Sequence, residues 1–157
     1  MADINIENFY KHIARILSIL YVNFPTKRAI YVDEVAGIDQ PDDYGLHSPE
    51  YTAGFYALLW LAEEGYLRYS DAIRQDGIDQ AIMTHKAFLR LTEISDPVYI
   101  DPNPQPEGNK VVQLQPIEDY SPSIQEDGKL IINQLRSALR SKSSIAITKA
   151  VTHILRA

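Results

Sequence analysis

Few side chains in this 157-residue sequence have the types and spacing that catalysis or metal binding requires. The chain has no cysteine, which excludes disulfides, thiolate metal sites and cysteine nucleophiles. None of its four histidines has a second one three or four residues away: they are His12, His47, His85 and His153. Zinc sites need three or four converging ligands, and no H-E-x-x-H motif is present. We therefore expect neither a metal nor another cofactor.

Acidic side chains also lack an arrangement that would support a reaction. Asp42–Asp43 and Glu63–Glu64 are adjacent pairs, and neighbours on a helix point about 100° apart, so we expect them to face solvent. Residues 71–79 contain three aspartates but not the alternating acids and distal glutamate of a calcium loop. Motifs for a nucleophilic serine, a phosphate loop or a dinucleotide site are absent. The sequence predicts a protein that is not an enzyme.

Aromatic residues are concentrated between residues 44 and 69. Tyrosine and tryptophan bury a large area while keeping a polar end in water, so one interpretation of this group is core packing. The other is a protein-binding patch, because aromatic side chains are enriched at interface hot spots. The candidate protein-binding residues are Tyr51, Phe55, Tyr56 and Trp60.

Charge is divided unevenly along the chain, whose net charge is −6. Residues 1–93 and residues 94–128 each carry −6, whereas residues 129–157 carry six basic side chains and no acid. A basic segment steers toward phosphate or acidic protein even on an anionic molecule, and it also suits docking on the chain's own acidic part. The candidate nucleic-acid contacts are Arg74, Arg136, Arg140, Lys142 and Lys149.

The elements that would position these side chains begin with an amphipathic helix. Apolar residues recur every three or four positions over residues 6–23, and Pro25 follows them, so we predict one helix there. Residues 28–32 are rich in β-formers and predict a short extended segment. Asp33 is expected to cap a brief helix that ends at Gly37, and a polar loop over residues 39–47 follows it.

A second long helix is predicted from Ser48 onward. Ser48-Pro49-Glu50 supplies a cap oxygen, a proline suited to the first turn and an acid at the positive helix end. The helix is expected to run to Glu64, with Gly65 as its stop. Its predicted buried face consists of Phe55, Leu58, Leu59 and Ala62.

An antiparallel ribbon is predicted next, followed by one more helix. We predict its two strands over residues 66–69 and 81–84, and Asp76-Gly77 is a dipeptide typical of a turn between such strands. Thr84 is expected to cap a helix that closes this domain near Thr92.

The last third of the chain has a different composition. Six of the nine prolines lie between residues 96 and 122, which predicts a linker and not a second core. Two apolar stripes follow, over residues 131–139 and 147–155, and their centres would lie roughly 130° apart on one continuous helix. We predict a break at residues 141–144 with a serine capping the second helix. The predicted domains are residues 1–93, an acidic linker over residues 94–128 and a basic helical segment over residues 129–157.

This order of elements resembles a winged-helix domain over residues 6–93. Leu61-Ala62-Glu63-Glu64-Gly65-Tyr66-Leu67, followed by the ribbon and by Met83-Thr84-His85, is similar to the third helix, the wing and the next helix start of bacterial winged-helix regulators. The resemblance implies a mainly α, α+β fold. DNA-reading members present basic or amide side chains from the third helix, whereas residues 49–64 contain no basic residue.

Three functions follow as hypotheses. The leading one is a non-enzymatic interaction module that binds protein, including a second copy of itself as a homodimer, with self-association through the C-terminal helices. The alternative is a DNA-binding regulator whose phosphate contacts come from those basic helices. Membrane attachment by residues 144–157 ranks last, because the apolar face has no Trp or Phe. The sequence has no secretion signal or bilayer-spanning stretch, so we expect a cytoplasmic protein.

Overall fold

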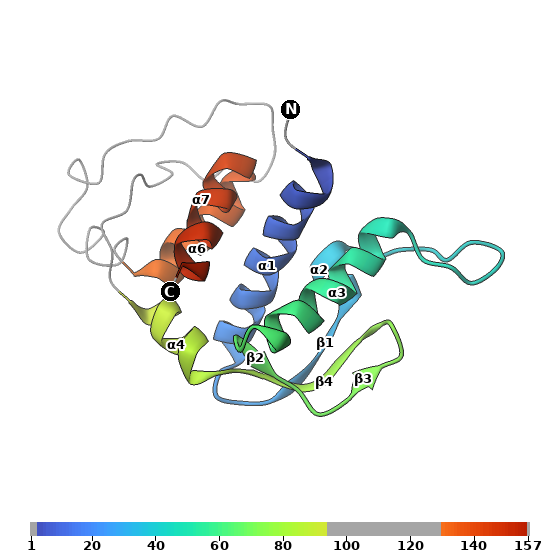
Figure 1. Cartoon of the computed structure of the whole chain (residues 1–157), viewed down its shortest axis with the longest axis horizontal. Helices are drawn as coiled ribbons and strands as arrows, with labels where there is room; N and C mark the ends of the chain where they lie inside the picture. Colours follow the sequence, from blue (N-terminus) through green and yellow to red (C-terminus); the bar gives the residue numbers. More distant parts are fainter. Residues whose placement is uncertain (1–2, 94–129, 157) are drawn as a thin grey trace. The chain divides into compact units, whose positions relative to one another are not determined.

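The computed structural model describes residues 3–93 and 130–156, and these form a mixed α+β structure (Figure 1). The elements of the first stretch are α1 (Ile4–Asn23), β1 (Arg28–Tyr31), α2 (Val32–Ala36), α3 (Pro49–Glu63), β2 (Leu67–Arg68), β3 (Ala72–Ile73), β4 (Gly77–Met83) and α4 (His85–Thr92). The second stretch contains α6 (Ile131–Ser141) and α7 (Ser144–Leu155). The predicted proline-rich linker lies outside the described residues.

The chain divides into two compact units, residues 1–88 and residues 89–157. The boundary falls within α4, a few residues before the predicted end of the first domain at residue 93. Of the helices that the structure describes, none is long and apolar enough to cross a membrane.

In the first unit, α3 packs against both α1 and α2. The predicted apolar face of α1 is confirmed in its central part, where Ile13, Ile16 and Leu17 are fully buried, whereas Ile6 near its start is exposed. Gly54 lets α3 approach α2 closely, because a Cβ atom there would lie 3.0 Å from Val32 Cγ1 and 3.1 Å from Ala36 Cβ. A larger side chain at this position would therefore make unusually tight contacts, and the neighbouring side chains of α2 would have to shift.

The strands form one antiparallel arrangement centred on β4, which pairs with β1, β2 and β3. The predicted ribbon is confirmed, with Leu67 opposite Met83. The predicted turn signal is confirmed at Asp76, which lies in the turn over residues 74–76, but not at Gly77. Gly77 is the first residue of β4, and the chain reverses just before it, where the Asp76 N–H donates to the Ile73 carbonyl at 2.9 Å.

The helix caps agree with the sequence at α3 and α4 but not at α2. Ser48 Oγ accepts the Tyr51 N–H at 3.2 Å, and Thr84 Oγ1 accepts the Ala87 N–H at 3.3 Å. The prediction that Asp33 caps α2 was wrong, because Tyr31 holds the cap position. Its N–H is satisfied by Glu34 Oε2 at 2.9 Å, so the acid three residues on replaces a side-chain cap.

The buried face of α3 is rotated from the predicted one. Phe55 and Leu58 are buried as expected, but Leu61 is fully buried whereas Leu59 and Ala62 are only half-buried. Apolar residues occur around most of this helix, so the sequence alone does not select the side that faces the core.

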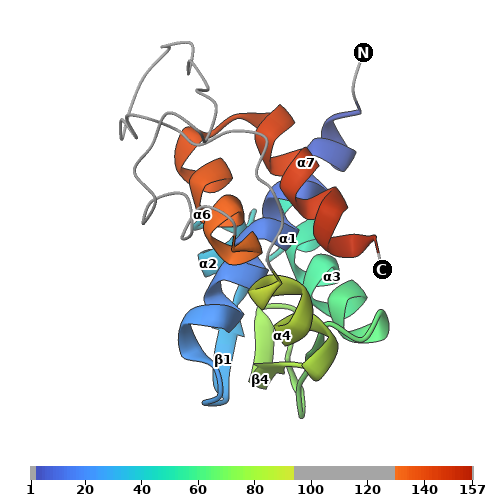
Figure 2. The same cartoon turned by 90° about the vertical axis from the view of Figure 1, so that its left-hand side faces the viewer.

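The second unit contains the helical pair α6 and α7, which pack against each other (Figure 2). The predicted break is confirmed: α6 ends at Ser141, and Ser143 Oγ accepts the Ala146 N–H at 3.3 Å to cap α7. Most of both apolar stripes is buried, and the buried residues are Ile131, Ile132, Leu135, Ala138, Ala146, Ile147, Val151 and Ile154. Leu139, Ala150 and Leu155 of the predicted stripes are half-buried.

Arg90 of α4 holds the end of α7. Its guanidinium donates to the carbonyl of Ile154 at 3.0 Å, to that of Arg156 at 2.7 Å and also to that of His153. Carbonyls at a helix C-terminus lack intrahelical partners and carry partial negative charge. One side chain thus satisfies three of them.

Candidate protein-interaction site

The segment between α2 and α3, residues 37–48, projects from the first unit as an extended loop (Figure 1). Three apolar side chains on it are exposed to solvent: Ile38 by 88%, Tyr44 by 89% and Leu46 by 65%. Apolar side chains that are this exposed contribute little of the hydrophobic stabilisation that they would contribute if they were buried. We call residues 37–48 the α2–α3 loop.

The tip of this loop is ordered by Asp42. Its Oδ1 accepts the N–H groups of Tyr44 and Leu46, each at 2.9 Å. The backbone closes the same turn, because the Asp42 N–H donates to the Leu46 carbonyl at 2.9 Å and the Gly45 N–H donates to the Asp42 carbonyl at 2.9 Å. Gly45 has φ +77°, a conformation that glycine adopts without strain. The tip therefore has a defined shape.

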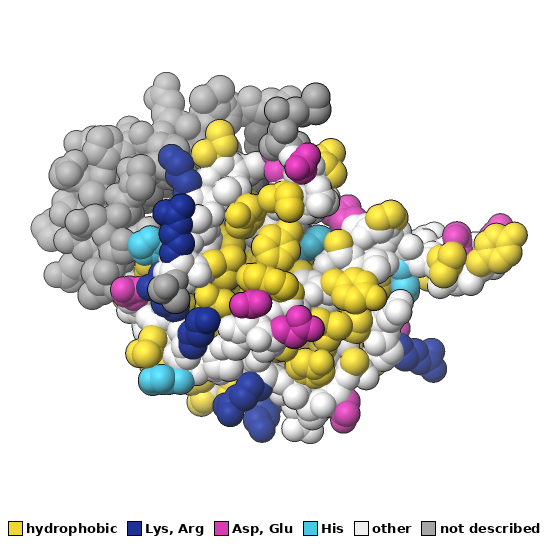
Figure 3. Space-filling model, viewed as in Figure 1, with side chains coloured by type: hydrophobic (Ala, Val, Ile, Leu, Met, Phe, Trp, Pro, Cys, Tyr) yellow, Lys and Arg dark blue, Asp and Glu magenta, His cyan; other side chains and the backbone are white. Residues whose placement is uncertain are grey.

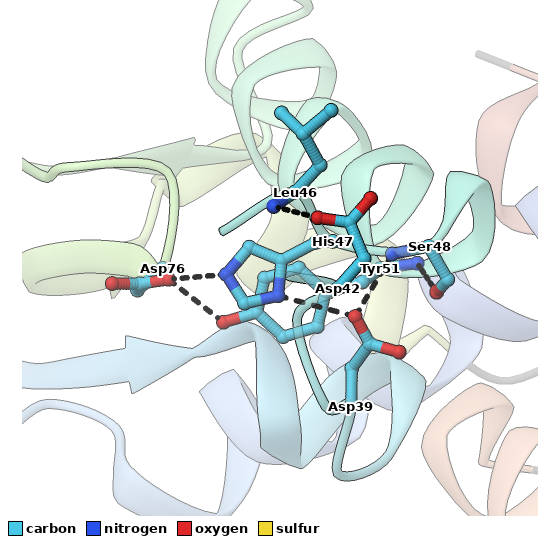
Figure 4. Close-up of polar contacts among 7 residues, drawn as sticks. All are labelled: Asp39, Asp42, Leu46, His47, Ser48, Tyr51 and Asp76. Carbon is cyan, nitrogen blue, oxygen red and sulfur yellow. Dashed lines mark hydrogen bonds and ion pairs between the residues drawn. The ribbon is translucent and has the colours of Figure 1, made fainter. Parts of the chain in front are cut away.

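The base of the loop is closed by His47, which lies between two carboxylates (Figure 4). Its Nδ1 is 3.1 Å from Asp39 Oδ2, and its Nε2 is 3.2 Å from Asp76 Oδ1. Each ring nitrogen of His47 is therefore within contact distance of a carboxylate oxygen. Asp76 is the residue before β4, and the contact therefore joins the loop to the sheet.

Asp39 also accepts the Ser48 N–H at 2.9 Å, at the cap position of α3. This backbone hydrogen bond, with a further contribution from His47, holds the pKa of Asp39 below its ordinary value. The ionised carboxylate is therefore favoured. It links the first residues of the loop to its last ones.

Tyr51 in the first turn of α3 completes the cluster. Its ring stacks on His47 with centroids 3.9 Å apart, and its hydroxyl donates to Asp76 Oδ1 at 3.0 Å. Burial, together with the neighbouring Asp76 carboxylate, raises the pKa of Tyr51 to about 12. We call Asp39, His47, Tyr51 and Asp76 the anchoring cluster.

The anchoring cluster does not have the geometry of a catalytic site. Both nitrogens of His47 already face carboxylates, so neither is directed at a nucleophile. Ser48 Oγ is engaged as the helix cap. Within residues 3–93 and 130–156 there is no group of three or more His, Asp or Glu side chains that could hold a metal ion. What the cluster does is fix the ends of the α2–α3 loop.

The four predicted protein-binding residues do not share one surface. Tyr51 and Phe55 are each only 5% exposed, and Tyr51 belongs to the anchoring cluster. Tyr56 is 56% exposed, and Trp60 is half-buried against the edge of Phe9 at 5.1 Å. Figure 3 shows hydrophobic side chains gathered on the visible face of α1 and α3, with acidic ones beside them. Tyr56 and Trp60 thus remain available at the surface.

The predicted nucleic-acid contacts are distributed over both units. Arg74 lies in the turn after β3 and is exposed. In the second unit Arg140, Lys142 and Lys149 are exposed, whereas Arg136 is half-buried. Arg156, which was not among the predicted contacts, is also exposed.

Sequence reasoning missed Asp39, His47 and Asp76 as one cluster. The nearest local signal was the well-formed helix start at Ser48, which follows His47 directly. Asp76 comes from a different element, so its place beside His47 is set by the tertiary fold. Comparison with protein-family models, curated proteins and solved structures gives no match for this chain. Function is therefore inferred from the geometry of these residues.

Proposed function

We propose that the protein is a non-enzymatic interaction module on a winged-helix scaffold, and that it binds another protein through the α2–α3 loop. The observation that carries this proposal is the exposure of Ile38, Tyr44 and Leu46 on a loop whose tip and base are both fixed by hydrogen bonds. A loop that is ordered before binding loses little conformational entropy when it docks.

The element order supports the winged-helix part of the proposal. Three helices, a ribbon formed by β2 and β4, and the Thr84-capped α4 follow one another, and β1 joins the ribbon through β4. The α2–α3 loop stands where a tight turn is expected between the two helices of a helix-turn-helix motif. A scaffold of this kind hosts many functions, so the loop and not the fold carries the functional argument.

The surface chemistry of α3 favours protein over DNA as its ligand. Its exposed charged residues are Glu50 and Glu63, and Tyr56 lies between them along the helix. Acidic side chains repel phosphates, which DNA-reading helices must approach closely. A partner with an apolar pocket and a basic rim fits the loop, because Asp42 and Asp43 directly precede Tyr44.

A photo-crosslinking amino acid at position 44, in the full chain within its own cells, tests this function. We expect a covalent adduct with protein, identified by mass spectrometry. The same amino acid at Asp71, which is also exposed but lies outside the loop, is the matched control. Absence of a protein adduct at position 44, or equal adducts at both positions, would refute the loop as the binding element.

Nucleic-acid binding by the C-terminal helices is the second candidate function. The observation that favours it is one exposed face of α7, where Lys149, His153 and Arg156 recur at helical spacing. Residues 129–157 carry six basic side chains and no acidic one. Such a surface attracts phosphate without reading base sequence.

Fluorescence anisotropy of random duplex DNA, titrated with the full chain at two salt concentrations, tests this candidate. We expect salt-sensitive binding that is lost when Arg136, Arg140, Lys142 and Lys149 are all changed to alanine. Unchanged affinity in that variant would exclude these residues as the phosphate contacts.

A further inference from the structure

We propose that the partner of the α2–α3 loop is a second copy of this chain, and that Tyr44 of one copy docks in the pocket between α6 and α7 of the other. This inference rests on the proposed function and names its partner. Two features carry it: a projecting acidic, apolar loop in the first unit and a basic pocket with a small-residue wall in the second.

The pocket has a volume of about 380 Å³, within the size range of sites that accept one bulky group. Ala138 and Ala146 lie on its buried side, with exposed fractions of 5% and 3%. Alanine side chains leave room above the helix backbones, so an aromatic ring can reach an apolar surface there. A tyrosine also keeps its hydroxyl near the polar rim of such a pocket.

Charge complementarity selects a second copy as the occupant. Lys149, His153 and Arg156 contribute to the pocket lining, which contains no carboxylate among the described residues. The loop places Asp42 and Asp43 immediately before Tyr44. More broadly, residues 1–93 carry −6 and residues 129–157 carry +6, so unlike parts of two copies attract each other.

Both docking surfaces are formed in the free chain. Asp42 orders the loop tip, as described above. On the pocket side, Ser143 caps the start of α7, and Arg90 holds the carbonyls at its end. Preorganised surfaces bind with a smaller entropic cost than surfaces that must fold first.

The resulting contact joins two different surfaces, so each copy retains a free loop or a free pocket after one contact forms. Head-to-tail contacts of this type continue into rings or open chains. Self-association would thus use the C-terminal helices at this pocket, whose lining includes Ala138 and Ala146 of the apolar stripes.

Sedimentation velocity of the full chain, from low micromolar to sub-millimolar concentration, tests the proposal. We expect concentration-dependent association that weakens with added salt. Tyr44→Ser in the loop and Arg156→Glu in the pocket should each leave the protein monomeric. Asp71→Lys and Arg140→Glu are charge-changing controls at exposed positions outside the loop and outside the pocket lining, and they should associate like the wild type. Unchanged urea transitions would show that every variant remains folded.

Mixing the two defective variants gives the sharpest outcome. The Arg156→Glu copy has an intact loop and the Tyr44→Ser copy has an intact pocket, so the mixture should form dimers and nothing larger. A wild type that is monomeric throughout, or site variants that associate like the controls, would overturn the inference. If the wild type is monomeric but position 44 crosslinks to a different protein in cells, the proposed function stands and only the second copy is excluded.

Discussion

The Tyr51 hydroxyl donates to Asp76 Oδ1 across 3.0 Å and so connects the first turn of α3 to the residue that precedes β4. The same carboxylate oxygen lies 3.2 Å from His47 Nε2. One aspartate therefore meets both a phenol and an imidazole, and these two rings stack on each other. The start of α3, the end of the α2–α3 loop and the start of β4 are thereby held as one assembly.

Tyr51→Phe should lower the free energy of unfolding by about 1 kcal/mol, because it removes one hydrogen bond and keeps the ring. Urea denaturation at neutral pH measures this loss. Phe55→Leu, a core substitution outside the anchoring cluster, is the control. It should leave the decrease of stability at alkaline pH the same as in the wild type.

The decrease of stability at alkaline pH follows from the pKa of Tyr51, which is raised from its ordinary value of 10.0 to about 12. The neutral phenol is favoured in the folded chain, so its stabilising contribution is complete below pH 10.0 and is lost as pH rises toward about 12. The slope of stability against pH in this interval should be smaller in Tyr51→Phe. An identical slope in the two proteins would contradict the assignment.

His12 should make the first unit sensitive to mild acid. It is 2% exposed, and burial is the main cause that lowers its pKa, with Glu50 opposing this effect and Arg15 and Lys11 adding to it. The unfolded chain takes up a proton more readily, so stability should fall as pH drops below 6.5 toward the lowered pKa.

His12→Leu should remove that acid sensitivity and raise stability at pH 5 by about 1 kcal/mol, because Nδ1 has no hydrogen-bond partner in the described part of the chain. Thermal unfolding at several pH values measures both effects. His85→Gln, at an exposed position, should keep the wild-type pH dependence. A His12→Leu variant with that same dependence would show that another group is responsible.

Gly77→Ala should disrupt the pairing of β1 with β4. A Cβ atom at Gly77 would lie 2.4 Å from the Ile30 carbonyl oxygen, so the strands would have to separate. We expect a loss of about 3 kcal/mol or more in the free energy of unfolding. At Gly65 there is open space but φ is +83°, so Gly65→Ala should cost only the backbone strain of about 1 kcal/mol. Equal losses would mean that the close approach at Gly77 is not the cause.

Arg90→Lys should loosen the last turn of α7, because an ammonium cannot reach the three carbonyls that the guanidinium fork contacts. Hydrogen exchange by mass spectrometry should show roughly tenfold faster exchange in the peptide that ends α7. The exposed Arg140→Lys is the matched control. Protection equal to that of the wild type would show that Arg90 does not stabilise this helix end.

Local signals in the sequence predicted the helix boundaries well. Ser48, Thr84 and Ser143 each act within three residues of themselves, so their capping function can be recognised without the fold. The cap of α2 was missed because Tyr31 has no preferred capping side chain, and Glu34 supplies the contact instead.

The candidate site was less predictable, because it depends on long-range packing. Tyr51 and Trp60 are both aromatic residues of α3, yet Tyr51 is buried as a member of the anchoring cluster whereas Trp60 is half-buried against α1. The spacing of these residues along the sequence does not predict this difference in their burial and contacts. Asp76 contacts His47 because it directly precedes β4, whose position in the fold places it beside the loop. The periodicity of the sequence does not predict this contact.

The Ser48 N–H donates to Asp39 Oδ2 at 2.9 Å, so the two ends of the α2–α3 loop are tied together independently of what lies between them. Residues 40–46 can therefore change in sequence, or even in length, while α3 keeps the same starting point. This segment can therefore be exchanged for another one while the helices and strands of the first unit stay unchanged. Evolution or an engineer could exchange its contents to redirect recognition without redesigning the core that supports it.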